Sequence, residues 1–260
     1  MNRQWLDLPA RPEKPRPSGL TMVIDNGLPT GWFSDAVASS APLIDIVKFG
    51  WGTCLVTDDL ARKIAVLADH DIRFCFGGTL FEKFVVQDRF DGFLKFCHHW
   101  GCELVEVSNG TIPLSNAEKA EYIRRCAEEF TVSSEVGFKD QARAELMSPA
   151  QWVDCIAEDL AAGANLVITE ARESGKSGIC RPDGKLRAGL VETILAAGAD
   201  ADRLLFEAPT KDLQAHFITL LGPNVNLGNV PLGDVIALET LRLGLRGDTL
   251  LHFEAASIYA

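Results

Sequence analysis

Carboxylate side chains recur near the ends of short apolar runs along this chain of 260 residues. Side chains alternate across a strand, so each carboxylate shares a face with the residue two positions before it, which is apolar in every case except Ser133 before Glu135. Gathered at one place, such carboxylates would repel one another and would be costly to desolvate unless cations compensated them. The residues in question are Asp25, Glu106, Glu135, Glu170 and Glu207.

Three cationic residues stand close to the same run ends and supply part of this compensation: Lys48, Lys139 and Arg172. A hard divalent cation with oxygen ligands would supply the remainder, and Mg²⁺ is the ion that this donor set suits. Such a site favours an anionic substrate, because fixed positive charge binds its carboxylate or phosphate. The same charge would stabilise an enolate or enediolate that forms during the reaction.

The segment Val167 to Ile179 contains a Gly-Lys-Ser tripeptide after a β-branched run, as a nucleotide-binding phosphate loop does. That loop needs a glycine five positions before Gly175, where this chain has Glu170, so the nucleotide interpretation fails. We expect a mobile lid or an anion clamp that uses Ser174 and Lys176, with an exposed turn as the alternative.

A second candidate phosphate site follows the last apolar run, where Asn226, Gly228 and Asn229 precede a segment compatible with a helix. Backbone N–H groups at such a helix start bind phosphate in many barrels. A tight turn that merely requires glycine is the alternative interpretation.

The elements that must position these residues alternate regularly along the chain. Eight apolar runs are separated by segments with apolar residues at i, i+3 and i+4, which predicts parallel βαβ units. Eight units in about 240 residues favour a single closed (β/α)₈ TIM barrel over an open doubly wound sheet. In such a barrel the C-terminal ends of the strands meet at one mouth, where we expect the five carboxylates and three cations to gather. The runs are 20–27, 43–53, 72–79, 104–111, 131–137, 166–172, 204–209 and 224–229.

The prolines and basic residues before Gly19 predict an extended, flexible N-terminal arm over residues 1–18, followed by the barrel domain over 19–260. The net charge of −11 disfavours partners with polyphosphate backbones or anionic lipid surfaces, so we expect neither a nucleic-acid nor a membrane role. Seven cysteines without a C-x-x-C pair, and an N-terminus without an apolar signal region, predict a cytoplasmic protein with reduced thiols.

Eight motifs along the chain resemble the phosphosulfolactate synthase family. The resemblance covers Gly19 to Thr249 and implies a TIM-barrel carbon–sulfur lyase that depends on Mg²⁺. Such an enzyme adds sulfite to phosphoenolpyruvate to give (2R)-phospho-3-sulfolactate, the opening step of one route to coenzyme M, and it could be a homo-oligomer. The motifs are KFGWGT, GGTLFE, VEVSNG, SEVGFKD, EARESGKSGI, FEAP, VNLGNV and LETLRLGLRGDT.

The resemblance also implies roles for individual residues. Lys139 matches the last lysine of the family's E-V-G-x-K segment and is expected to be the catalytic acid or base, with a pKa lowered towards neutrality. Lys48 and Arg172 are expected to bind the carboxylate, phosphate or sulfite groups. The expected metal ligands are Glu135, Glu170 and Glu207, with Glu106 and Asp25 as further candidates.

Two positions depart from the family's pattern, because Asn26 and Phe138 stand where many members carry lysine. The loss of two cations leaves open a related barrel lyase that acts on another enolate-forming phosphorylated or carboxylic acid. A non-catalytic relative of the plant heat-stress type is a further alternative. The retained charged residues of the mouth argue against it, because a purely structural protein has no evident need for them.

Overall fold

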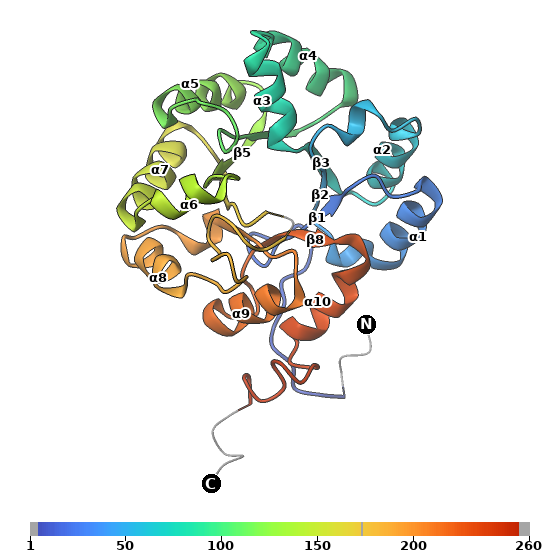
Figure 1. Ribbon diagram of the computed structural model, residues 1–260. Helices are drawn as coiled ribbons and strands as arrows, with labels where there is room; N and C mark the ends of the chain where they lie inside the picture. The colour runs from blue at the N-terminus through green and yellow to red at the C-terminus, as the bar shows by residue number, and fades with distance from the viewer. Residues whose placement is uncertain (1–4, 173, 255–260) are drawn as a thin grey trace.

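The computed structural model describes residues 5–172 and 174–254, in which eight parallel strands form a ring surrounded by helices (Figure 1). The ladders run in the order β3-β2-β1-β8-β7-β6-β5-β4, and β3 also contacts β4, so the ring is nearly closed. The predicted (β/α)₈ TIM barrel is confirmed. The strands are β1 (Thr21–Asp25), β2 (Ile46–Phe49), β3 (Arg73–Phe76), β4 (Leu104–Val107), β5 (Thr131–Val136), β6 (Leu166–Thr169), β7 (Leu204–Glu207) and β8 (Leu227–Pro231).

The helices pack outside the strands, and two of them follow β3 and two follow β5 where one would suffice. Ser115 and Ser148 form capping boxes that fix the starts of α5 and α7. None of the helices in the described part combines the length and apolar character needed to cross a membrane. The helices are α1 (Thr30–Ser40), α2 (Leu60–Ala68), α3 (Gly78–Val86), α4 (Phe90–Trp100), α5 (Asn116–Ala127), α6 (Gln141–Leu146), α7 (Pro149–Ala162), α8 (Ala188–Ala196), α9 (Lys211–Leu221) and α10 (Val235–Arg242).

The interior of the barrel is a packed apolar layer, separate from the larger core between the strands and the helices. Because side chains alternate along each strand, the next inward-facing residue beyond this layer lies nearer the C-terminal mouth. The apolar layer therefore forms a floor under the charged residues of the mouth. Its members are Met22, Ile46, Cys75, Leu104, Ile168 and Leu205.

The N-terminal arm, expected to be flexible, is held against the N-terminal end of the barrel where the structure describes it. The buried Arg11 guanidinium donates to the carbonyl oxygens of Gly19 (3.0 Å) and Pro223 (3.1 Å). It also pairs with Glu239 of α10, with 3.3 Å between Nε and Oε2. These contacts join the arm to segments that enter β1 and β8.

Candidate active site

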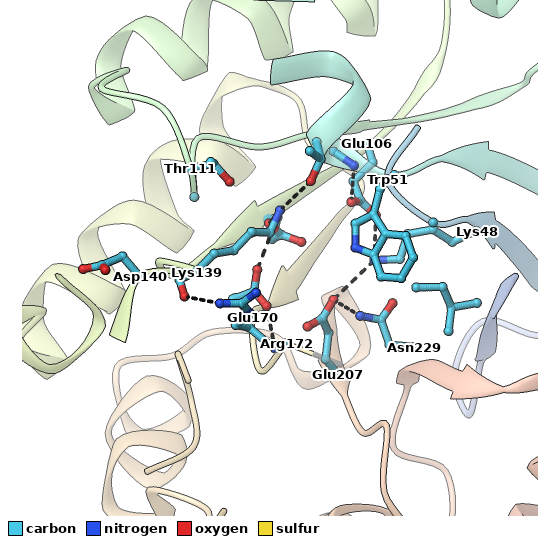
Figure 2. A pocket seen from close by; sticks show the side chains of 17 residues that line it. Lys48, Trp51, Glu106, Thr111, Lys139, Asp140, Glu170, Arg172, Glu207 and Asn229 are labelled. Atoms are coloured by element: carbon cyan, nitrogen blue, oxygen red, sulfur yellow. Dashed lines mark hydrogen bonds and ion pairs between the residues drawn. The ribbon is translucent and has the colours of Figure 1, made fainter. Parts of the chain in front are cut away.

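A cavity of about 460 Å³ opens at the C-terminal ends of the strands, and four buried glutamates and Lys48 line it (Figure 2). Each glutamate comes from a different one of four adjacent strands or the residue just after it, β4 to β7. The prediction that these groups meet at the barrel mouth is confirmed. The glutamates are Glu106, Glu135, Glu170 and Glu207.

Lys48 bridges two carboxylates on strands that lie far from β2 in the ring. Its Nζ lies 3.1 Å from Glu106 Oε2 and 3.3 Å from Glu207 Oε1. Burial alone would lower the pKa of Lys48, but the carboxylates of Glu106 and Glu207 raise it well above its usual value. Lys48 is therefore a permanent ammonium ion in the mouth.

Lys139 reaches into the same cavity from the loop after β5 and lies between two carboxylates. Its Nζ is 3.1 Å from Glu135 Oε1, 3.9 Å from Glu170 Oε2 and 3.2 Å from the Thr79 hydroxyl. Burial alone would lower the pKa of Lys139, but these carboxylates outweigh burial and raise it. The expectation of a pKa lowered towards neutrality is wrong, because the charges of Glu135 and Glu170 outweigh the effect of burial. Lys139 therefore carries a proton that it can donate.

The two carboxylates beside Lys139 titrate in opposite directions. Burial disfavours ionisation of Glu135, but Lys139, Lys48 and a hydrogen bond from Ser108 (2.8 Å) together lower its pKa to about 2. Burial raises the pKa of Glu170 well above its usual value, and the charges of Glu135 and Glu207 raise it further. Of the two carboxylates, Glu135 is therefore the one that stays ionised at neutral pH, and Glu170 is the one whose protonated form the mouth favours.

Backbone strain is concentrated at the rim of the cavity. Trp51, Arg172 and Asn229 have φ values of 51°, 58° and 52°, in the left-handed region that non-glycine residues rarely adopt, and all three line the cavity. The Arg172 guanidinium donates to the Lys139 carbonyl at 3.1 Å, and Asn229 Nδ2 donates to Glu207 Oε1. The strained conformations direct these side chains towards the cavity, as Figure 2 shows.

The lining of the cavity suits a hard divalent cation. Five acidic residues face three basic ones, and Glu170 Oε2 has no hydrogen-bond partner among the described residues. No three histidine, cysteine, aspartate or glutamate side chains in residues 5–172 and 174–254 form a metal-binding group. The donor set therefore fits an ion held by one or two carboxylates together with water and substrate, as is usual for Mg²⁺.

Asp25 does not lie in the mouth, and the prediction that it does is wrong. Its face of β1 points towards the helices, where Lys63 of α2 pairs with it at 2.6 Å. Its other oxygen accepts the backbone N–H groups of Gly27 (2.9 Å) and Leu28 (2.8 Å). Alternation defines two faces of a strand but does not reveal which one faces the barrel interior, and on β1 Met22 takes the inward side.

The residues of the phosphate site predicted at the end of β8 lie in three different places. Asn226 lies at the opposite end of the barrel, where its oxygen accepts the Leu20 N–H at 2.9 Å, because β8 begins only at Leu227. Gly228 faces the barrel interior, where a Cβ would lie 2.2 Å from Leu205. Asn229 alone of the three lines the mouth cavity.

The Gly-Lys-Ser loop also lies away from the mouth. Ser174 and Lys176 are exposed, and neither lines the cavity with the four glutamates. Lys176 lines a different cavity, together with residues of α6. The expected anion clamp therefore does not act at the barrel mouth.

Glu82 of α3 is a buried carboxylate near the site that sequence reasoning missed. It accepts the Thr111 N–H at 2.8 Å and lies 3.3 Å from the Ser108 hydroxyl, which donates to Glu135. Its charge helps to raise the pKa of Lys139. The GGTLFE segment contains Glu82, but a search restricted to strand residues could not place a helical side chain behind the mouth.

Comparison with known proteins adds independent evidence. The sequence model of the family described as ComA, (2R)-phospho-3-sulfolactate synthase, matches residues 9–248. The phosphosulfolactate synthase of Bacillus subtilis (strain 168) is 54% identical over 249 residues, which cover 96% of this chain and 99% of the relative. That of Methanocaldococcus jannaschii is 42% identical over 235 residues, which cover 89% and 93% of the two chains.

Among solved structures, 3-keto-L-gulonate-6-phosphate decarboxylase from Vibrio cholerae superposes with a TM-score of 0.55 at 10% identity. The match covers 91% of this chain and 100% of that one, and at this identity it shows the barrel fold alone. The family match and the two relatives each cover almost all of the barrel. The chain therefore belongs to the phosphosulfolactate synthase family.

Proposed function

We propose that this protein adds sulfite to phosphoenolpyruvate in a Mg²⁺-dependent reaction and releases (2R)-phospho-3-sulfolactate. The observation that carries the proposal is the placement of a protonated Lys139 between Glu135 and Glu170 at a cavity that Lys48 and Arg172 also line. Family membership supplies the choice of substrates. The lined cavity supplies the charges that such substrates need.

In the proposed reaction, the sulfur lone pair of sulfite forms a bond to C3 of phosphoenolpyruvate. The C2–C3 π electrons move towards C2 and the carboxylate, and an aci-carboxylate forms. Lys139 then donates its proton to C2 and regains one from solvent, so the overall reaction consumes one sulfite and one proton. Removal of a positioned acid of this kind slows turnover by about 10²–10⁴-fold.

Lys48 and Arg172 would bind the anionic groups of the substrates, because both are cationic and line the cavity. Glu170 would hold Mg²⁺ with Glu135 or Glu207, since its Oε2 has no hydrogen-bond partner in the described part of the chain and lies 3.9 Å from the Lys139 ammonium. When bound, Mg²⁺ would stabilise the negative charge that develops on the substrate carboxylate.

The two departures from the family pattern do not alter the lining of the cavity. Asn26 is exposed, and Phe138 packs against the Arg143 guanidinium at 4.0 Å; neither side chain lines the mouth. Because both residues lie outside the cavity lining, these departures give no reason to prefer a lyase with a different acid substrate over the family's reaction.

The proposal is tested by mixing purified protein, Mg²⁺, phosphoenolpyruvate and sulfite, and following phosphoenolpyruvate absorbance and the sulfonated product. We expect loss of phosphoenolpyruvate that requires both sulfite and Mg²⁺. Lys139→Met should lower kcat by about 10²–10⁴-fold, whereas Lys185→Gln, which replaces an exposed lysine outside the cavity, should keep it. No consumption of phosphoenolpyruvate, together with no Mg²⁺-dependent thermal shift by it, would refute the proposal.

A further inference from the structure

A second cavity, of about 340 Å³, is lined by residues of α6 and of the long loop that connects β6 to α8. It shares no lining residue with the mouth cavity. Its lining includes Lys176, the lysine of the Gly-Lys-Ser motif, which has no role in the proposed reaction. The polar and thiol side chains that line it include Gln141, Glu145, Lys176, Cys180, Arg181 and Arg187.

Basic side chains outnumber acidic ones in the lining of this cavity. Lys176, Arg181 and Arg187 line it against one carboxylate, Glu145, and none of the three cations has an ion-pair partner within 4 Å among the described residues. Such a concentration of unpaired cations stands out in a chain of net charge −11.

The contacts of Arg187 show that the positive charge of this cavity is only partly balanced by acidic groups. Its guanidinium is only partly exposed, and it donates to the carbonyl oxygens of Gly178 (3.3 Å), Ala144 (3.5 Å) and Met147 (3.5 Å). Burial lowers the pKa of Arg187, and the neighbouring charge of Arg181 lowers it further. These long contacts to neutral oxygens leave capacity for a stronger, charged acceptor.

The loop that forms this cavity is tied to the catalytic residues. Ile179 N donates to the Glu170 carbonyl at 2.8 Å, and the Ser177 hydroxyl donates to the Phe138 carbonyl at 3.0 Å. Gly178 has a φ of 60° and packs so closely that a Cβ would lie 1.9 Å from the Glu170 carbonyl oxygen. A ligand in the second cavity would therefore hold the segment that carries Glu170 against the one that carries Lys139.

We propose that the second cavity binds a tetrahedral oxyanion of the phosphate or sulfate class, and that its occupancy orders the loop between β6 and α8. Two guanidinium groups and an ammonium offer the planar and point-charge donors that such oxyanions accept. The volume exceeds that of a bare oxyanion, so the ligand is either an inorganic ion with ordered water or the oxyanion group of a small organic acid.

The test is calorimetric titration of the metal-free protein with inorganic phosphate, in EDTA and at constant ionic strength. Arg181→Gln removes one exposed cation of the cavity and should preserve the fold, while Lys185→Gln removes an exposed lysine of the same loop that does not line it. We expect one phosphate per chain in the wild type, binding about tenfold weaker in Arg181→Gln, and unchanged binding in Lys185→Gln. Lys139→Met should also bind phosphate normally, because the mouth is a separate cavity.

Hydrogen exchange distinguishes ordering of the loop by bound phosphate from general screening of charge by salt. Phosphate should slow exchange in residues 174–187 of the wild type but not of Arg181→Gln, and chloride should do neither. Repeating the titration with 3-phosphoglycerate distinguishes the sources, since tighter binding than phosphate indicates an organic ligand and equal binding an inorganic one. Equal phosphate affinity in Arg181→Gln and wild type, loss of binding in Lys139→Met, or the same response to chloride would each overturn the proposal.

Discussion

Glutamine in place of Glu170 is expected to stabilise the metal-free protein against unfolding at neutral pH. Glu170 is 1% exposed, and burial together with the charges of Glu135 and Glu207 raises its pKa well above the usual value of 4.5. Folding therefore favours the protonated form of Glu170, whereas the group is ionised at pH 7 in the unfolded chain. Glutamine imitates the neutral form, and its oxygen can still accept the Arg172 N–H that Glu170 Oε1 accepts at 2.5 Å.

The size of the effect follows from the proton that Glu170 must take up on folding. Protonation of a carboxyl group with a pKa of 4.5 at pH 7 costs about 3 kcal/mol, at roughly 1.4 kcal/mol per pH unit. Because the folded pKa lies above the unfolded one, the wild type loses stability as pH rises from 4.5 towards the folded pKa. The advantage of Glu170→Gln should thus be close to zero near pH 4.5 and grow with pH until it levels off at the folded pKa. The cost of protonation at pH 7 sets its upper limit at about 3 kcal/mol, or about 6–12 °C in Tm.

Glu135→Gln should have the opposite effect, although the two carboxylates flank the same lysine. Lys139 and Lys48 overcome burial and lower the pKa of Glu135 to about 2. Because the folded pKa lies below the unfolded one, Glu135 contributes stability above pH 4.5 and loses it as pH falls towards about 2. Its replacement should therefore destabilise the protein at neutral pH.

Thermal denaturation of metal-free protein at pH 5 and pH 7.5, followed by circular dichroism, checks both expectations. Glu192→Gln, at an exposed position of α8, controls for the change in net charge. A Glu170→Gln protein that is less stable than the wild type at pH 7.5, or equally stabilised at pH 5 and 7.5, would refute the electrostatic reasoning. The same result for Glu135→Gln and Glu170→Gln would also refute it.

Three further changes test the placements that the structure assigns. Lys63→Met should destabilise the protein by about 3–5 kcal/mol in urea denaturation, because it leaves the Asp25 carboxylate buried without its cation. The response of Tm to Mg²⁺ should not change in this variant, and loss of that response would indicate that Asp25 belongs to the metal site. Arg11→Met should lower the free energy of unfolding by about 1–3 kcal/mol with kcat intact, since its contacts lie at the end of the barrel remote from the mouth; a large fall in kcat would contradict this. Gly178→Ala should lower kcat by about 100-fold, because its Cβ would collide with the Glu170 carbonyl; wild-type kcat would show that the loop does not position Glu170.

Much of the site could be predicted because strand alternation is a local property of the sequence. Ile168 and Glu170 must share a face if the segment is a strand, and the same holds for Leu104 with Glu106 and for Leu205 with Glu207. The repeated order of strands and helices then requires a barrel that collects the strand ends at one mouth. The sequence alone thus determined the barrel fold and the glutamates that stand near strand ends, but not which face of each strand points inward.

Tertiary structure decided what depends on neighbours distant along the chain. It placed Asp25 against Lys63, moved Lys176 to a cavity of its own, and added Glu82 from a helix. It also raised the pKa of Lys139, because Glu135, four residues earlier, and Glu170, from the end of another strand, both lie beside its ammonium group. The choice of strand face, the surroundings of a loop and the charge around a titrating group are long-range properties that a local sequence pattern does not contain.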